Sequence, residues 1–217
     1  MKVAFFDFDK TLIERNSGSL WLRHQIRAGA VGYGDAARAG AWLLWYHLGL
    51  SGLENAMRLA ITTLAGQQED ALRAKVKAFY ASEVRPYYRP LGLETLRRHQ
   101  DDGDAVVLLT SASVYLGEAV QQEFGLDDII CNRFQVDDEG VFTGEPEGLL
   151  CFGEGKRVLG EAWLRARGAG PAAFYTDSMS DVSFMEVVEE PVAVTPDPRL
   201  RRLAKRRGWR IEDWRKR

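Results

Sequence analysis

Acidic and hydroxyl side chains follow three short apolar segments of this chain, at the points where β-strands would end. These side chains are Asp7 and Asp9, then Thr110 and Ser111, then Asp177 and Asp181. In a parallel sheet the carboxyl ends of neighbouring strands open into one crevice, so the three pairs are expected to lie close together. The sequence therefore predicts a polar site, rich in carboxylates, at one edge of a sheet.

A cluster of carboxylates favours a particular chemistry. Carboxylates that share a site repel each other, and a bound divalent cation relieves that repulsion. No His or Cys stands beside these aspartates in the sequence, and a ligand set made only of oxygen favours Mg²⁺ over zinc. Because Mg²⁺ usually shares its coordination shell with a substrate phosphate, the same residues predict a phosphate-binding site.

The order of these residues resembles the haloacid dehalogenase-like superfamily. The segment DFDKT at 7–11 matches its first motif, DxDxT, and Ser111 after VVLL fits the second. Lys156 fits the third motif, and TDSMSD, which contains Asp177 and Asp181, fits the fourth. The spacing of the motifs and the helical insertion resemble the phosphoserine-phosphatase-like branch, subfamily IB. The resemblance covers the whole chain.

The resemblance implies a role for each carboxylate. Asp7 would attack phosphorus and form an aspartyl-phosphate, and Asp9 would protonate the leaving alcohol and then deprotonate the attacking water. Mg²⁺ would be held by Asp7, by the backbone carbonyl of Asp9 and by Asp177. Asp181 would support this shell from behind. Cations are needed because an anionic nucleophile approaches an anionic phosphoryl group.

Two further residues would bind the phosphate. Ser111 would donate a hydrogen bond to a phosphoryl oxygen, with Thr110 as the alternative donor. Without the resemblance, Ser111 and Ser113 precede a predicted helix and would serve as N-cap residues. Lys156 would act as a compact positive charge beside the phosphate, whereas an isolated lysine is more often a solvated surface residue.

Three positions depart from the family pattern. Thr176 stands where the fourth motif usually has glycine, and the β-branched threonine makes that loop stiffer than glycine would. Asn16 replaces a glutamate that contacts the substrate's amino group in phosphoserine phosphatases, and Ala60 replaces a carboxylate-binding arginine. Arg58 is two residues earlier, about 200° around the helix, and does not simply substitute. Asn16 and Arg58 are candidate specificity residues, and phosphoserine is expected to be a poor substrate unless a helix shift brings Arg58 or Arg73 into the site.

The elements that position these residues alternate between strand and helix, except in one helical stretch. Residues 14–85 have helical periodicity, and four helices are expected there, near 20–26, 36–48, 53–64 and 72–80. Elsewhere we expect strands at 3–8, 105–109, 172–176 and 192–194, with a hairpin turn at 138–140. We expect helices at 91–100, at 155–167, around 184–185 and at 199–207, and one helix that ends at 124. The expected fold is an α/β domain with a doubly wound, mainly parallel sheet, formed by residues 1–13 and 86–217 and interrupted by an α-helical cap at 14–85.

The composition is that of a folded globular protein. Of 217 residues, 46% are hydrophobic and 28% are charged, which excludes a disordered or fibrous chain. The net charge of -2 gives no global electrostatic reason to expect a nucleic-acid partner. Residues 199–217 nevertheless hold ten Lys or Arg and two acids. We interpret this segment first as a solvated helix face, and second as a contact for anionic lipid or nucleic acid.

The cysteine content and the lengths of the apolar runs indicate the cellular compartment of the protein. Cys131 and Cys151 are too few for a disulfide framework, so two reduced thiols are expected, with a single bridge as the alternative. The N-terminus has no signal-peptide pattern. The longest apolar run, 41–50, is about half the length of a bilayer span, so no transmembrane segment is expected. These features together predict a cytoplasmic protein.

The predicted cap is unusually aromatic. Its aromatic residues are Trp21, Tyr33, Trp42, Trp45, Tyr46, Phe79 and Tyr80. We interpret them first as a packed helical core. The alternatives are an apolar pocket for a larger phosphate ester and an apolar surface that forms a homodimer.

Three functions follow from these observations. The leading one is a Mg²⁺-dependent phosphomonoester phosphatase that acts on a small-molecule phosphate ester through an aspartyl-phosphate. The second is phosphoserine phosphatase itself, against which Asn16 and Ala60 count. The third is a catalytically idle binding or regulatory protein on the same scaffold, which the complete motif set opposes. A dehalogenase is disfavoured because an acid is present at Asp9.

Overall fold

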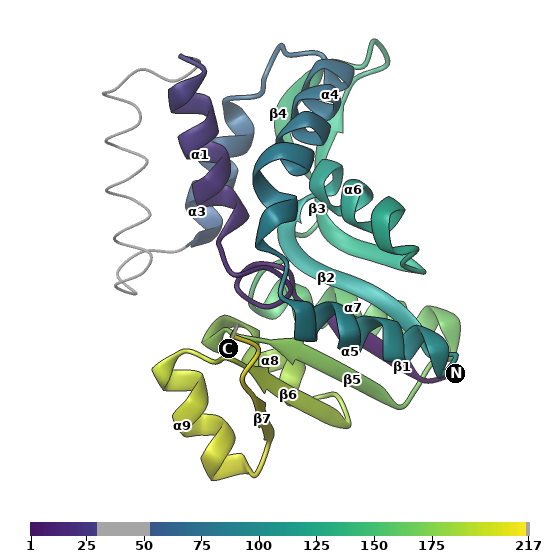
Figure 1. Ribbon diagram of the computed structural model, residues 1–217. Helices are drawn as coiled ribbons and strands as arrows, with labels where there is room; N and C mark the ends of the chain where they lie inside the picture. Colours follow the sequence, from purple (N-terminus) through teal and green to yellow (C-terminus); the bar gives the residue numbers. More distant parts are fainter. Residues whose placement is uncertain (30–52, 216–217) are drawn as a thin grey trace.

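A single mixed sheet runs through the protein, whose computed structural model describes residues 1–29 and 53–215. In these residues seven strands lie in the order β4-β3-β2-β1-β5-β6-β7, as Figure 1 shows. The strands are β1 (Val3–Phe6), β2 (Ala105–Ser113), β3 (Asp128–Val136), β4 (Phe142–Glu147), β5 (Ala172–Thr176), β6 (Glu190–Val194) and β7 (Arg210–Glu212). Only β4 is antiparallel to its neighbour, so the predicted mainly parallel sheet is confirmed.

The strand β1 is central because its sequence, VAFF, is apolar on both faces. It pairs in parallel with β2 and with β5, so Val3 lies opposite Ala105 on one side and Ala172 on the other. All four residues of β1 are buried. The carboxyl ends of β1, β2 and β5 are therefore neighbours, which is the arrangement that the polar residues after these strands require.

Helices cover both faces of the sheet. Alternate residues of β1 belong to two separate hydrophobic clusters: Phe6 faces one and Phe5 the other. The first face is covered by α5 (Pro90–Asp101) and α6 (Val114–Phe124), and the second by α7 (Glu154–Arg167), α8 (Val182–Met185) and α9 (Pro198–Arg207). This double covering confirms the predicted doubly wound α/β class.

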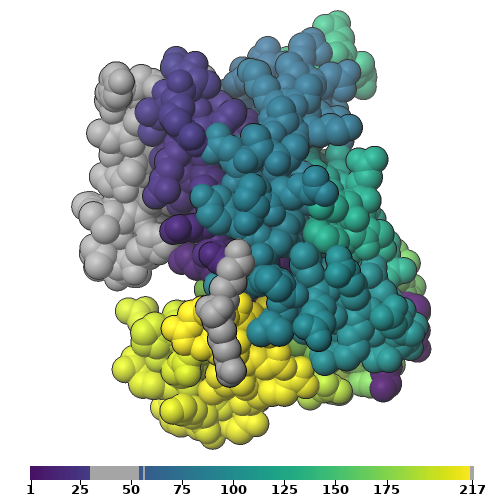
Figure 2. Space-filling model, in the orientation of Figure 1, coloured from purple at the N-terminus to yellow at the C-terminus, as the bar shows by residue number. Residues whose placement is uncertain are grey.

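The inserted segment forms a helical layer beside the sheet. It contains α1 (Ser17–Arg27), α3 (Leu53–Thr62), α4 (Glu69–Phe79) and the π-helical turn Tyr80–Val84. Trp21 packs edge-on against Phe79, with ring centroids 5.0 Å apart. Figure 2 shows these helices, in purple and blue, in contact with the teal surface of the core. The division into residues 1–13 and 86–217 on one side and 14–85 on the other stays a prediction.

The cap is tied to the β3–β4 hairpin as well as to the loop after β1. The backbone of Gly66 donates to Phe142, and that of Phe142 donates to Gln67, each at 2.9 Å. Arg73 of α4 forms ion pairs with Glu69, at 2.9 Å, and with Glu118 of α6. The predicted hairpin is thus confirmed, and it also supports the cap.

The aromatic residues of the described cap form a core. Phe79 and Tyr80 are buried and Trp21 is partly buried against them, which agrees with the first interpretation for these three. The other predicted cap aromatics, Tyr33, Trp42, Trp45 and Tyr46, and the helix expected at 36–48 lie outside the described residues. The homodimer surface stays a prediction.

Several element boundaries differ from the expectation. The second strand does not end at 109 but continues to Ser113, with a shift in its register against β3 after Leu109. The helix expected around 184–185 is only one turn long and follows a 3₁₀ turn, Met179–Asp181. The edge strand β7 was not expected, because the sequence RIE lacks the apolar run that marks a buried strand.

The C-terminal basic helix is anchored through one apolar stripe. Leu200 and Ala204 are buried, and Asp197 caps the helix by accepting from the backbone amides of Arg199 and Leu200. The basic side chains face outward, and Arg207 forms an ion pair with Glu186 at 2.8 Å. Both the solvated-face and the anionic-contact interpretations stay predictions.

The two cysteines and the helix lengths agree with the expectations from sequence. Cys131 and Cys151 are both free and buried, and burial raises the pKa of Cys131 to about 12. The alternative of a disulfide is therefore wrong. Across 1–29 and 53–215, every helix is too short or too polar to cross a membrane.

Candidate active site

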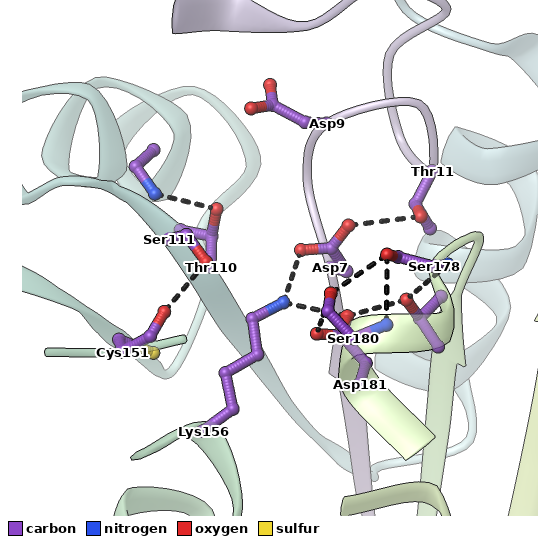
Figure 3. A network of polar contacts seen from close by, with 12 residues as sticks. Asp7, Asp9, Thr11, Thr110, Ser111, Cys151, Lys156, Ser178, Ser180 and Asp181 are labelled. Atoms are coloured by element: carbon purple, nitrogen blue, oxygen red, sulfur yellow. Dashed lines mark hydrogen bonds and ion pairs between the residues drawn. The ribbon is translucent and has the colours of Figure 1, made fainter. Parts of the chain in front are cut away.

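A buried lysine joins two of the predicted acidic motifs. The ammonium of Lys156, in the first turn of α7, donates to Asp7 Oδ1 at 2.7 Å and to Asp181 Oδ2 at 2.9 Å. Lys156 is 2% exposed, and Figure 3 shows its side chain reaching between the two carboxylates. Gly155 makes this approach possible, since a Cβ at that position would lie 2.0 Å from the carbonyl oxygen of Leu150.

The electrostatic balance around Lys156 is uneven. Burial alone would lower the pKa of Lys156, but the carboxylates of Asp181 and Asp7 outweigh it, so the pKa is raised and the lysine stays protonated. Burial raises the pKa of Asp7 to about 7 although Lys156 opposes this, and the neighbouring carboxylate of Asp181 adds to the rise. One ammonium therefore does not neutralise all the negative charge gathered here.

Two threonines fix the geometry of the aspartates. The hydroxyl of Thr11 donates to Asp7 Oδ2 at 3.2 Å and accepts from the backbone N–H of Asp177 at 3.0 Å, so it joins the first motif to the fourth. The hydroxyl of Thr176 donates to Asp181 Oδ2 at 2.7 Å. The departure from glycine at Thr176 thus gives Asp181 an additional hydrogen-bond donor.

The second aspartate of the first motif is oriented by the cap. Asp9 accepts from the backbone N–H of Ser17 at 2.8 Å and from the side-chain amide of Asn16 at 3.1 Å. Burial raises the pKa of Asp9, and the hydrogen bond from Ser17 opposes that rise. In Figure 3 its carboxylate lies apart from the Asp7–Lys156–Asp181 cluster. Asn16 therefore touches an acid of the site, a contact that its sequence position alone did not predict.

Ser111 lies beside the cluster, with its hydroxyl engaged by the chain. It donates to the carbonyl oxygen of Cys151 at 2.7 Å, and its own carbonyl accepts from Asn132 at 2.6 Å. The N-cap interpretation is wrong for Ser111, because the N-cap residue of α6 is Ser113, whose side chain makes no capping hydrogen bond. Phosphate binding by Ser111 stays a prediction, with Thr110 as the alternative donor.

Asn132 was missed by the sequence analysis. It lies within β3 and is 2% exposed. Its side-chain NH₂ donates to the carbonyl oxygen of Ser111, and its side-chain oxygen accepts from the backbone N–H of Cys151 at 2.8 Å. It thereby fixes the loop before Lys156 against the end of β2. Other polar residues share this strand, whose sequence is DIICNRFQV, so the sequence offered no signal that singled out Asn132.

The cap arginines considered for substrate binding are engaged elsewhere. Arg58 is exposed on α3 and pairs with Glu54 at 3.0 Å. Arg73 pairs with Glu69 and Glu118. Neither makes a polar contact with a site aspartate in the described residues. The candidate specificity role of Arg58 is therefore not supported by a contact, and it stays an untested prediction.

A second buried cation lies behind the loop that follows β1. Arg89 is 6% exposed, and its guanidinium donates to the carbonyl oxygen of Lys10 at 3.3 Å. Its Nε is the one buried side-chain polar atom without a hydrogen-bond partner in the described residues. Burial lowers the pKa of Arg89, whereas Glu14 and Asp177 favour its charged form.

The donor set at the site fits a hard divalent cation. Partial burial raises the pKa of Asp177 well above its usual range, and the neighbouring carboxylate of Asp7 adds to this. The Asp177 carboxylate takes part in no hydrogen bond within the described residues. The described residues contain no cluster of three or more His, Cys, Asp or Glu side chains arranged to hold a metal ion. Asp7, Asp177 and the backbone carbonyl of Asp9 would offer oxygen ligands alone, the type that Mg²⁺ prefers.

Comparisons with known proteins agree with this geometry. A model of the haloacid dehalogenase-like hydrolase family matches residues 4–186. The chain is 30% identical to a histidinol-phosphatase of Neisseria meningitidis, over 96% of this chain and 97% of that protein. It is 29% identical to a phosphoserine phosphatase of Mycobacterium tuberculosis, over 98% of this chain and 70% of that protein.

Solved structures show the same fold. A protein of unknown function from Bordetella pertussis superposes with a TM-score of 0.89 at 30% identity, and 99% of each chain is covered. A substrate-bound phosphoserine phosphatase superposes with a TM-score of 0.71 at 18% identity, over 99% of this chain and 93% of that one. At that identity the second likeness shows the fold alone.

The uneven charge balance makes a prediction about stability in metal-free buffer. Asp181→Ala removes one of the two carboxylates that Lys156 contacts and the acceptor of the Thr176 hydroxyl. It should cost about 3–5 kcal/mol of unfolding free energy.

The pKa of Asp7 is raised in the folded protein, so the contribution of Asp7 to the free energy of unfolding is fully present below pH 3.8 and is lost as the pH rises through about 7. Asp7→Asn should therefore be as stable as wild type, or more stable, at pH 8.

Urea unfolding at pH 8 with chelator measures both variants. Asp70→Ala, at an exposed acid on α4, is the control for loss of a carboxylate. An Asp7→Asn variant that is less stable than Asp181→Ala would contradict this account of the charge balance.

Proposed function

The chain belongs to the haloacid dehalogenase-like hydrolase family, and we propose that it is a Mg²⁺-dependent phosphomonoester phosphatase that works through an aspartyl-phosphate on Asp7. The family match and the phosphatase names of its relatives identify it as a phosphoric monoester hydrolase. The observation that best supports the proposed mechanism is the buried contact of Lys156 with Asp7 and Asp181.

In the first step a carboxylate oxygen of Asp7 forms a bond to phosphorus while the ester P–O bond breaks. Asp9 transfers its proton to the departing alkoxide, which leaves as the alcohol. Thr11 and Lys156 each bind one oxygen of Asp7, so the nucleophile is held in one orientation. Fixing a reacting group in this way avoids an entropic cost at the transition state.

In the second step Asp9, now a carboxylate, takes a proton from water while the water oxygen forms a bond to phosphorus. The P–O bond to Asp7 breaks, and inorganic phosphate and the free carboxylate are released. The donors on Asp9, from Ser17 and Asn16, favour its carboxylate form, and burial favours its protonated form. These opposed influences suit a group that must act first as an acid and then as a base.

The residues proposed to hold Mg²⁺ are Asp7, Asp177 and the backbone carbonyl of Asp9. The ion would supply positive charge that stabilises the phosphoryl oxygens. Lys156 adds a fixed charge next to the phosphate, and Asp181 orients Lys156 through its hydrogen bond. Ser111 is proposed to donate to a phosphoryl oxygen, which requires its hydroxyl to turn away from Cys151.

The proposed substrate is a small phosphate ester whose alcohol has no carboxylate. Asn16 supplies no charge, and its side chain is committed to Asp9 and Ser19. In the described cap Arg58 and Arg73 are paired with glutamates. An alcohol without a carboxylate does not need an arginine partner. Histidinol phosphate has that property, and the relative from Neisseria meningitidis is named for it.

The metal assignment predicts a competition between Mg²⁺ and protons. Chelator should abolish phosphatase activity and Mg²⁺ should restore it. Because burial raises the pKa values of Asp7 and Asp177, protons compete more strongly for these carboxylates at pH 5.5 than at pH 8. Mg²⁺ should therefore raise the melting temperature more at pH 8 than at pH 5.5.

Thermal unfolding with and without Mg²⁺ tests this at both pH values. Asp177→Ala should remove the stabilisation by Mg²⁺, and Asp70→Ala should keep it. Full activity in chelator, or an unchanged Mg²⁺ effect in Asp177→Ala, would refute the assignment.

The substrate proposal predicts an order of kcat/KM. A missing charge-assisted hydrogen bond costs roughly 1.5–3 kcal/mol, or about ten- to a hundredfold in rate. Phosphoserine, whose amino acid end needs an acid and a base, should therefore be hydrolysed at least tenfold less efficiently than histidinol phosphate or a simple alkyl phosphate. A panel of these esters measures the order, and a hundredfold advantage for phosphoserine would restore phosphoserine phosphatase as the function.

A further inference from the structure

Both the oxygen and the NH₂ group of the Asn16 side chain make hydrogen bonds. It is the N-cap residue of α1, and its Oδ1 accepts from the backbone N–H of Ser19 at 2.9 Å and from the Ser19 hydroxyl at 3.0 Å. Since a backbone N–H can only donate, the oxygen must face Ser19. The NH₂ group is thereby directed to Asp9 Oδ2, 3.1 Å away.

The first turn of α1 contacts both oxygens of Asp9. The backbone N–H of Ser17 donates to Oδ1 at 2.8 Å, while Asn16 donates to Oδ2. Ser17 is buried, at 4% exposure, so its bond is shielded from water. The carboxylate of Asp9 is therefore fixed in position by the beginning of the first cap helix and not by the strand that precedes it.

We propose that Asn16 is a positioning residue, which holds Asp9 in the orientation that proton transfer requires. The inference rests on the proposed function, in which Asp9 is the acid and base. A general acid must come within about 2.6–3.2 Å of the atom that it protonates, and small misplacements of a catalytic group reduce rates strongly. The position that a charged specificity residue has in phosphoserine phosphatases thus serves here to orient the acid.

Two substitutions separate this role from helix capping. Serine is as good an N-cap as asparagine, whereas alanine is a poor one. The serine hydroxyl can accept from the N–H of Ser19 but offers no amide that reaches Asp9. Asn16→Ser therefore removes the bond to Asp9 and keeps the cap, and Asn16→Ala removes both.

The measurement is kcat/KM on two substrates that differ in their leaving groups, because kcat/KM reports phosphoryl transfer to Asp7 and not the later hydrolysis step that both substrates share. An alkyl alkoxide needs protonation as it leaves, whereas p-nitrophenolate does not. Asn16→Ser and Asn16→Ala should each lose roughly 10- to 100-fold on an alkyl phosphate, and less than about threefold on p-nitrophenyl phosphate. A uniform structural defect would lower both rates alike.

Melting temperatures, a neighbouring variant and a double variant provide the controls. Asn16→Ser should melt near the wild-type temperature, and Asn16→Ala lower. Ser19→Ala, which perturbs the same network on the side away from Asp9, should keep the wild-type ratio of the two rates. Asn16→Ser added to Asp9→Asn should cause no further loss on the alkyl phosphate, because the group that it positions is already inactive.

The outcomes separate a failure of the positioning role of Asn16 from a failure of the proposed role of Asp9. If Asp9→Asn shows the leaving-group selectivity and Asn16→Ser shows equal losses on both substrates, or none, the positioning role is refuted and the proposed function stands. If Asp9→Asn itself shows no such selectivity, the assignment of Asp9 as the acid fails, and the role of Asn16 fails with it.

Discussion

One buried ammonium group serves two carboxylates, and the rest of the site depends on this imbalance. Lys156 lies within hydrogen-bond distance of Asp7 and Asp181, while Asp177 and Asp9 lie nearby with raised pKa values of their own. A protein interior disfavours uncompensated charge. The fold therefore keeps Asp7 in a state that another cation, or a proton, would stabilise.

The architecture creates this imbalance by convergence. β1 is bordered by β2 and β5 in parallel, so the residues that follow the strands meet at one edge. Helix α7 begins at the same edge, and Gly155 lets its first turn approach the preceding loop closely. Thr11 and Thr176 then fix the aspartates with neutral donors, which orient the carboxylates without neutralising them.

Much of this could be predicted from the sequence, because strand ends and motif order are local signals. The parallel core, the hairpin at 138–140 and the strand Ala172–Thr176 follow from short-range patterns. The proximity of Asp7 and Asp181 followed from the strand ends of a parallel sheet. Lys156 was added only through the resemblance, since nothing local relates it to Asp7, 149 positions away.

Other features depend on tertiary contacts that no local pattern encodes. The hydroxyl of Ser111 was expected to be free for phosphate or capping, but it bonds to Cys151, because the loop before α7 folds onto the end of β2. The second strand continues past Leu109, where Asn132 supports it. The sequence marks Asn16 only as a candidate specificity position, because its contact with Asp9 depends on how α1 begins.

The most direct test of the account is to identify the residue that becomes phosphorylated. A single turnover with a phosphate ester is quenched in acid and reduced with borohydride, which converts an aspartyl-phosphate to homoserine, and the product is mapped by peptide mass spectrometry. The account predicts homoserine at position 7 and at no other aspartate, and none in Asp7→Asn. A turnover that leaves Asp7 unmodified while phosphate accumulates on Ser111 or on another residue would contradict it.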